Sequence, residues 1–364
     1  MTEAKPGKGK LLIAGGGTGG HVFPALAIAR EWMSRGGERE VVFVGTQRGI
    51  EARLVPEAGF PLEMIRSAGL KGIGGMKLAR NTAKLVPAMW DSFAILRRRR
   101  FGAALGVGGY AAGPMMLAAV LRGLPTVVFE PNAEPGFTNR VLARMATRIA
   151  TAYESPTRLW GTKATLTGIP VRPEFFAIPP RVPAEPLHLL ITGGSQGALV
   201  INRTLVDAAE LLAAQQHRVS IVHQTGERDY NAVRVAYARR GINAEVLPFI
   251  RNMAERFAQA DLIVCRAGAI TAAEVAAAGR AAVFIPFGAS TDSHQLRNAQ
   301  EMERAGAARL IPEPQLSAER LTQEIFSLMD RPAELQSMAA SARRLAKPQA
   351  VQEIVNLIEE VSPS

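Results

Sequence analysis

The sequence has little of what usually marks a disulfide-stabilised, membrane-spanning or secreted protein. Its 364 residues contain one cysteine, Cys265, which excludes an internal disulfide framework and indicates a reducing compartment. No run of about 18 uncharged apolar residues occurs, so we expect no membrane-spanning helix. Residues 1–9 are polar and do not resemble a signal peptide.

Metal-ligand patterns are also missing. The chain contains no Asp-x-Asp pair and no His/Cys cluster with zinc spacing, so we expect neither a metal ion nor a cofactor. Aromatic residues make up only 6%, and no zinc-finger or RNA-recognition pattern occurs, which argues against nucleic acid. A net charge of +11 and a pI of about 10.3 nevertheless indicate an anionic partner, such as a nucleotide or an acidic membrane surface.

Two glycine-rich loops, each after an apolar strand, are the most informative features that are present. The first has five glycines among residues 15–20 and is followed by His21, whereas the second reads Gly-Gly-Ser195-Gln-Gly over residues 193–197. A strand, a glycine loop and a helix commonly bind phosphate groups in α/β proteins. Two copies predict two doubly wound halves that face each other across a cleft.

Strand and helix patterns alternate along the rest of the chain. Continuous apolar runs predict buried parallel strands at 11–14, 41–45, 104–107, 126–129, 187–192, 219–223, 245–248, 262–265 and 281–285, with helices such as 25–33, 115–121 and 138–145 between them. Residues 168–186 hold six prolines, which predict an interdomain linker without regular helix. We therefore expect domains at 1–168 and 187–347, a linker at 169–186, and a last helix within 349–364.

The first loop matches a dinucleotide-binding fingerprint only in part. Gly15-x-Gly17-x-x-Gly20 fits, but the second strand ends in Gly45-Thr46-Gln47 without the acidic residue that would bind ribose. An NAD-dependent enzyme is therefore disfavoured, and the Lys-Ser/Thr of a nucleotide-hydrolysing phosphate loop is missing as well. Close strand–helix packing explains one or two glycines; five indicate close approach of a ligand.

Several polar residues have both a structural and a functional interpretation. His21 can be a general base or can bond the backbone at a helix start. Thr271-x-x-Glu274 matches a capping box, while Glu274 can also accept hydrogen bonds from ribose. Arg172 can pair with a phosphate or be an exposed linker residue. Polar residues also follow two further strands: Glu130 and Asn132 in the first half, and Asp292, Ser293, His294 and Gln295 in the second, where Asp292 or Ser293 can cap a helix.

Residues 70–100 combine apolar and cationic side chains. Lys71, Lys77, Arg80 and Lys84 alternate with Ile73, Met76, Leu78, Leu85, Val86, Met89 and Trp90, and Arg97 to Arg100 follow. Apolar side chains beside cations suit an anionic bilayer surface, whereas an ordinary helix packed on a sheet is the structural alternative. The charge of +11 favours the membrane hypothesis.

Together the motifs resemble those of the MurG family, bacterial transferases that add N-acetylglucosamine to the lipid-linked muramyl-pentapeptide precursor of peptidoglycan. The resemblance runs from about residue 10 to the C-terminal helix. It rests on Gly-Gly-Thr18-Gly-Gly-His21, Gly-Gly-Tyr110-x-x-Gly-Pro, Gly-Ile-Pro-Val-Arg172, Gly-Gly-Ser195-Gln-Gly-Ala and Cys-Arg-x-Gly-Ala-Ile-Thr271-x-x-Glu274.

The resemblance implies a GT-B fold, with two Rossmann-like domains and a last helix that returns to the first. It implies an inverting transfer from UDP-N-acetylglucosamine to lipid I at the cytoplasmic face of the inner membrane, with residues 70–100 as the peripheral docking region. Implied donor contacts are Ser195 with the diphosphate, Ile250 with uracil, Glu274 with ribose, Gln295 with the sugar, and Ala269, Ile270, Thr271, Arg172, Asn132, Thr18, Gly19 and Gly20 nearby. His21 is the implied base, Glu130 its alternative, and Tyr110 lies near the acceptor.

The chain departs from the family pattern at Pro131, His294 and Ala267, where the family often has glutamine, glutamine and serine. Two other functions remain open from the sequence. UDP-N-acetylglucosamine 2-epimerases share the fold pattern but need no membrane patch. A non-enzymatic binding module would leave the polar groups at both strand edges without a purpose.

Overall fold

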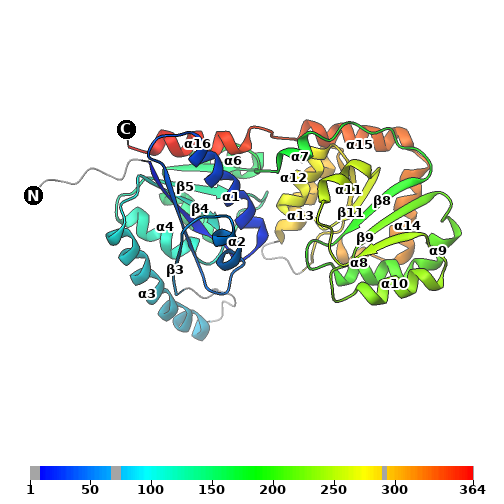
Figure 1. Cartoon of the computed structure of the whole chain (residues 1–364), viewed down its shortest axis with the longest axis horizontal. Coiled ribbons are helices and arrows are strands. Elements are labelled where there is room, and N and C mark those ends of the chain that lie inside the picture. Colours follow the sequence, from blue (N-terminus) through cyan, green and yellow to red (C-terminus); the bar gives the residue numbers. More distant parts are fainter. Residues whose placement is uncertain (1–8, 67–74, 289–292, 364) are drawn as a thin grey trace, which may run out of the picture. The chain divides into compact units, whose positions relative to one another are not determined.

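The computed structural model describes residues 9–66, 75–288 and 293–363, which form two compact units (Figure 1). Unit 1 comprises Met1–Pro170 together with Gln349–Ser364, and unit 2 comprises Val171–Pro348. Each unit is built around one parallel sheet. The predicted α/β class with two doubly wound domains is confirmed.

The sheet of unit 1 has seven parallel strands in the order β3-β2-β1-β4-β5-β6-β7. The strands are β1 (Lys10–Gly15), β2 (Glu40–Gly45), β3 (Leu62–Met64), β4 (Ala103–Gly108), β5 (Thr126–Glu130), β6 (Arg148–Thr151) and β7 (Ala164–Leu166). β1 and β4 are buried over nearly their whole length, because helices cover both faces of a parallel sheet. The strand order reverses between β1 and β4, which creates a switch point at the carboxyl edge of the sheet.

Helices connect these strands. They are α1 (Gly19–Ser34), α2 (Glu51–Glu57), α3 (Gly75–Arg98), α4 (Ala112–Leu121), α5 (Phe137–Met145) and α6 (Glu154–Trp160). The final helix, α16 (Ala350–Val361), also packs in this unit against α1, β4, β5 and β6 (Figure 1). Its apolar face, which includes the fully buried Ile354 and Ile358, contributes hydrophobic burial. Arg35 and Arg39, in the connection between α1 and β2, bind Glu359 at its polar edge.

Unit 2 repeats the strand order of unit 1 with one strand fewer. Its parallel sheet runs β10-β9-β8-β11-β12-β13. The strands are β8 (Leu187–Thr192), β9 (Val219–Gln224), β10 (Ala244–Leu247), β11 (Leu262–Cys265), β12 (Ala281–Phe284) and β13 (Ala308–Leu310). The order reverses between β8 and β11, which creates a second switch point after the second glycine loop.

The helices of unit 2 are α7 (Pro173–Phe176), α8 (Leu199–Asp207), α9 (Ala209–Ala214), α10 (Tyr230–Arg239), α11 (Met253–Gln259), α12 (Ala269–Ala278), α13 (His294–Arg304), α14 (Ala318–Met329) and α15 (Pro332–Arg344). Their apolar faces bury two clusters, one on each face of the sheet. Cys265 lies fully buried in the second cluster, where burial raises the pKa of its thiol. The Cys265 side chain therefore packs in the core of unit 2.

The proline-rich segment is more ordered than its composition predicts. α7 is a one-turn helix with Pro173 at its first turn, where a missing N–H costs nothing, so the expectation of no helix here is wrong. Phe175 is fully buried and meets Phe257 edge-on at 5.1 Å. Arg280 and Arg343 donate to the carbonyls of residues 176, 178 and 179, which fixes the segment to unit 2.

All nine predicted strands are present. The sequence analysis missed β3, β6, β7 and β13, which have three or four residues each. β3 and β7 lie at sheet edges and contain no fully buried residue, so no continuous apolar run marks them.

Candidate functional site

The first glycine loop connects β1 to α1 at the switch point of unit 1. A Cβ on Gly15 would lie 2.4 Å from a methyl carbon of Val107, and one on Gly16 would lie 2.1 Å from the carboxyl carbon of Glu51. Packing thus accounts for these two glycines. Gly17 has a φ of 89° and no atom within 4 Å of a built Cβ. The open part of the loop is therefore its second half, from Gly17 to Gly20.

The structure corrects the expectation that no carboxylate reaches the tip of the second strand. Glu51, at the start of α2, folds back so that Oε1 accepts hydrogen bonds from the backbone N–H and the hydroxyl of Thr46, each at 3.0 Å. Oε2 accepts from Gly17 N at 2.6 Å. The carboxylate sits behind the glycine loop with both oxygens bonded inside the protein. This arrangement disfavours both ribose binding by Glu51 and phosphate binding at Gly17.

His21 lies in the first turn of α1, between the two loops of the switch point. Its Nδ1 is 3.0 Å from the carbonyl oxygen of Gly16 and 3.3 Å from Oγ1 of Thr18. A carbonyl only accepts hydrogen bonds, so Nδ1 carries the proton and Nε2 of the neutral ring is the basic nitrogen. Nε2 lies over Gly108, where an added Cβ would be 3.0 Å away.

Tyr110 follows β4 on the neighbouring loop of the same switch point. Gly109, with a φ of 85°, lies so close to the first loop that an added Cβ would be 2.2 Å from the Gly16 carbonyl oxygen. Gly16 N also donates to Gly108 O at 3.2 Å. Tyr110 itself is 45% exposed. The structure thus brings Thr18, His21 and Tyr110 to one end of the unit 1 sheet.

Glu130 and Asn132 form a separate group at the end of β5. Both Glu130 oxygens are occupied: Oε1 accepts from the backbone and side-chain nitrogens of Asn132, and Oε2 from Gly136 N and Asn139 Nδ2. Glu130 is 1% exposed, and burial raises the pKa of its carboxyl although these donors oppose the shift. With these bonds Glu130 holds together the loop that follows β5.

The second glycine loop has the same close backbone contacts in unit 2. A Cβ on Gly197, which has a φ of 71°, would lie 1.8 Å from the carbonyl oxygen of Thr225, and one on Gly226 would lie 2.3 Å from that of Gln196. Ser195 is exposed at the tip of the loop, just before α8. The loop therefore presents a hydroxyl, open backbone and a helix N-terminus on one side.

Gln224, at the end of β9, supports this loop and was missed from the sequence. Its Nε2 donates to Gly194 O at 2.8 Å, and its Oε1 accepts from Ile250 N at 2.7 Å. The side chain is 1% exposed. Because the Ile250 amide is taken and its side chain is buried, the carbonyl of Ile250 is the group it can offer to a ligand. A polar residue at a strand end was the available signal.

At the end of β11 the capping-box prediction is wrong. α12 begins at Ala269 with Gly268 as its N-cap, so Ala269, Ile270 and Thr271 form its first turn and Thr271 is not the cap. Glu274 instead lies 3.6 Å from Nη2 of Arg172. Burial raises the pKa of Glu274 to about 7, and the nearby Arg172 guanidinium opposes the shift.

Arg172 is more than an exposed linker residue. Its Nη1 lies 3.4 Å from Glu174, and its guanidinium stacks 4.9 Å above the ring of Phe175. These contacts hold a cation beside Glu274 at the carboxyl edge of unit 2.

The end of β12 contributes Gln295, whose Oε1 accepts from Phe287 N at 3.0 Å. The cap predicted at Ser293 is not formed by its side chain, and Asp292 lies outside the described residues.

Comparison with known proteins identifies the family. The N-terminal domain model of glycosyltransferase family 28 matches residues 11–151, and its C-terminal domain model matches residues 188–354. Relatives from Pelobacter propionicus and Solibacter usitatus are each 44% identical over 96% of this chain, and the match covers 98% and 96% of their own lengths. Both are named UDP-N-acetylglucosamine–N-acetylmuramyl-(pentapeptide) pyrophosphoryl-undecaprenol N-acetylglucosamine transferase. The chain belongs to the MurG family within glycosyltransferase family 28.

Solved structures agree with this assignment. The crystal structure of Acinetobacter baumannii MurG is 35% identical, with a TM-score of 0.82 over 96% of this chain and 99% of that chain. The UDP-GlcNAc 2-epimerase of Neisseria meningitidis has a TM-score of 0.67 over 96% of this chain and all of its own, but only 13% identity, so it shows the fold alone. The chain therefore has the GT-B type of fold and is a glycosyltransferase.

The departures of this MurG-family chain fit its local structure. Both carboxyl oxygens of Glu130 are hydrogen-bonded although Pro131 has no N–H, because Asn132, Gly136 and Asn139 supply the donors. Ala267 is fully buried, and its carbonyl accepts from Asn298 Nδ2 at 3.2 Å. Within the described residues, no three His, Cys, Asp or Glu side chains are grouped so as to bind a metal ion.

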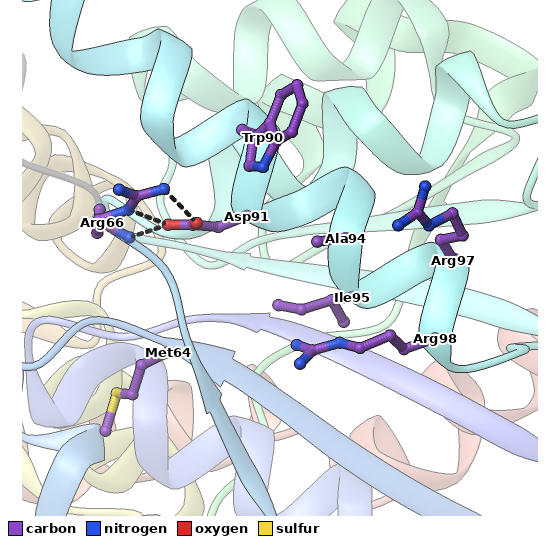
Figure 2. A pocket seen from close by; sticks show the side chains of 8 residues that line it. All are labelled: Met64, Arg66, Trp90, Asp91, Ala94, Ile95, Arg97 and Arg98. Atoms are coloured by element: carbon purple, nitrogen blue, oxygen red, sulfur yellow. Dashed lines mark hydrogen bonds and ion pairs between the residues drawn. The ribbon is translucent and has the colours of Figure 1, made fainter.

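The family member also carries an amphipathic surface on α3. Val86 and Trp90 are 68% and 73% exposed, and Arg97 to Arg100 are exposed beyond them. Trp90 and Arg97 also line a hollow of about 410 Å³. Figure 2 shows its lining side chains, among which Arg66 binds both oxygens of Asp91. Residues 67–74 and the side chains of 75–84 lie outside the described part. Among the described helices, none has the length and apolarity to cross a bilayer.

We expect Glu274 to make stability fall with rising pH. Between about pH 5 and 7 the unfolded carboxyl, with its usual pKa of 4.5, has lost its proton, whereas the folded one, with a pKa of about 7, retains it. The folded state then binds more protons, so raising the pH favours unfolding. Relative to Glu274→Gln, the wild-type free energy of unfolding should fall by about 1–2 kcal/mol across this window.

Urea denaturation at several pH values measures this difference. Glu174→Gln is the matched control, because Glu174 also faces Arg172 but its side chain is 49% exposed. Parallel pH dependence in the wild type and Glu274→Gln would contradict the raised pKa.

Proposed function

We propose that this chain transfers N-acetylglucosamine from UDP-N-acetylglucosamine to lipid I, the undecaprenyl-linked muramyl-pentapeptide, and so forms lipid II. The chain's 44% identity to transferases named for that reaction supports the substrate pair. The assignment of donor and acceptor to different units rests on one observation, which is the side chain that lies behind each glycine loop. Glu51 places a carboxylate behind the first loop, whereas the neutral amide of Gln224 supports the second.

That difference assigns the donor to unit 2. A buried carboxylate repels a diphosphate, so the first loop is a poor phosphate site despite its glycines. The second loop presents the Ser195 hydroxyl and the N-terminus of α8, both of which stabilise an anionic leaving group. We assign the diphosphate to Ser195 and to Arg172 nearby in the same unit.

The remaining donor contacts follow from the neighbouring strand ends of unit 2. The Ile250 carbonyl accepts the N3–H of uracil, and the first turn of α12, at Ala269, Ile270 and Thr271, lines the nucleotide. Glu274 accepts from the ribose hydroxyls, because no capping bond occupies it. Gln295 binds the sugar.

The acceptor is assigned to unit 1, with Tyr110 beside it. His21 Nε2 takes the proton of the attacking hydroxyl as that oxygen bonds to the anomeric carbon. The bond from the anomeric carbon to the UDP oxygen breaks, and UDP leaves with its electron pair, which inverts the configuration. Thr18, Gly19 and Gly20, in the open half of the loop, are assigned to contacts with the donor sugar, and Asn132 adds an amide at the same sheet edge.

His21 is preferred to Glu130 as the base. Both Glu130 oxygens are already bonded by four N–H donors, and the group is 1% exposed. His21 has the tautomer that a base requires, since Nδ1 carries the proton toward Gly16.

Membrane association is part of the proposal. The exposed Trp90 and Val86 beside Arg97 to Arg100 suit the interface of an anionic bilayer, where aromatic side chains insert and arginines pair with phosphate. A peripheral location at the cytoplasmic face of the inner membrane would bring the acceptor's lipid anchor to this unit. The proposal involves no nucleic acid.

Calorimetric titration tests the donor. Titrating UDP-N-acetylglucosamine, UDP-glucose and NAD into the full chain should give the tightest binding with UDP-N-acetylglucosamine and none with NAD. Transfer of labelled N-acetylglucosamine onto lipid I then completes the test. Binding of NAD alone, or conversion of the donor to its 2-epimer without transfer, would overturn the proposal.

His21→Ala should lower kcat by about 10²-fold or more, because general-base catalysis contributes on that order. Donor affinity, measured by calorimetry, should stay close to that of the wild type. His217→Ala is the control, since His217 is exposed in unit 2. Near-normal turnover of a folded His21→Ala protein would remove His21 from this role.

Trp90→Ser should weaken binding to vesicles that contain anionic lipid, by several-fold in a sedimentation assay. Binding of the wild type to the same vesicles should also weaken as salt is raised, because salt screens the charges of the arginines. Leu159→Ser is the control, as Leu159 is 63% exposed on α6 of the same unit. Equal binding by Trp90→Ser and Leu159→Ser, or binding that ignores salt, would contradict this surface.

A further inference from the structure

A single peptide group links Glu51 to His21. The N–H of Gly17, 2.6 Å from Glu51 Oε2, and the C=O of Gly16, 3.0 Å from His21 Nδ1, belong to the same peptide bond. In a trans peptide these two groups point in opposite directions. The carboxylate therefore bonds one side of the peptide and the imidazole bonds the other. The arrangement resembles a carboxylate–histidine pair with a peptide inserted between its members.

We propose that Glu51 is a positioning residue for His21, acting through the Gly16–Gly17 peptide to orient the imidazole and to stabilise its protonated form. This inference rests on the proposed role of His21 as the base. The bond to Glu51 polarises the peptide, because hydrogen bonds in a chain strengthen one another. The Gly16 carbonyl then accepts more strongly from Nδ1–H, as the imidazole gains a proton at Nε2.

The surroundings of Glu51 are built to hold a carboxylate here. Glu51 is 1% exposed, and its described partners are two backbone N–H groups and one hydroxyl, all of which donate to its carboxyl oxygens. Three glycines leave room for it: a Cβ on Gly16, Gly45 or Gly49 would lie between 1.9 and 2.5 Å from Glu51 side-chain atoms. A side chain that only filled this space would not need hydrogen bonds to both of its carboxyl oxygens.

Removing the charge while keeping the shape is the first test. Glu51→Gln should lower kcat by about tenfold with donor KM within about twofold of wild type, because the donor is bound by unit 2. The acid limb of the kcat–pH profile should move to lower pH by about half a unit, as the imidazolium loses support. Glu57→Gln is the matched control, an exposed glutamate on the same helix.

Displacing the carboxylate without removing its charge is the second test. A Cβ at Gly49 would lie 1.9 Å from Glu51 Oε2, so Gly49→Ala should push the carboxylate away from Gly17. This variant should reproduce the loss in kcat and the shift in pH profile. It also keeps the inference testable if Glu51→Gln fails to fold, which thermal melting reports.

An NMR titration of the His21 ring separates this inference from the proposed function. In both variants the midpoint of His21 should fall by about half a pH unit relative to Glu57→Gln, whatever the reaction of the enzyme. An unchanged midpoint and an unchanged kcat–pH profile in a folded variant would overturn the role of Glu51. Absence of transfer by the wild type would overturn the proposed function instead, and full activity of His21→Ala would remove His21 from the role of base on which this inference rests.

Discussion

The close approach of each glycine loop to the backbone that follows a neighbouring strand is the constraint on which both candidate sites depend. In unit 1 the glycine loop after β1 meets the loop after β4, and in unit 2 the glycine loop after β8 meets the loop after β9. Gly109 contacts the first loop and Gly197 contacts the chain at Thr225, each at a distance that leaves no room for a side chain. The glycines therefore serve two needs: some let the loops touch, and others leave backbone open toward a ligand.

The two units share one strand order, but the side chains that support their glycine loops differ in charge. Glu51 supports the first loop with a buried carboxylate, and Gln224 supports the second with a neutral amide of nearly the same shape. This difference in charge separates the loop that we assign to the basic histidine from the loop that we assign to the diphosphate. The two units therefore repeat the strand order, while the side chain that supports each glycine loop differs.

Buried polar groups stabilise these loops without joining in the chemistry. His223 is fully buried between Tyr237 and Asn202, and desolvation lowers its pKa to about 3, so it stays neutral. Asn202 in turn donates to Thr225 O and Asp229, which fixes the strand end against which Gly197 packs. Arg280 and Arg343 hold the carbonyls of the proline-rich segment in the same way. Leaving any of these groups unpaired would cost about 1–3 kcal/mol.

Local signals in the sequence, which are continuous apolar runs and glycine spacing, were sufficient to predict the two-domain α/β fold, the central strands, both glycine loops and the family. The groups that lie behind the loops became known only from the folded structure. Glu51 is 34 residues from Gly17, and Gln224 is 26 from Ile250, so no local pattern relates them. The capping box at Thr271 failed for the same reason: α12 begins two residues earlier, and Arg172, distant in sequence, pairs with Glu274. Long-range contacts at a sheet edge, rather than local propensity, give these side chains their partners.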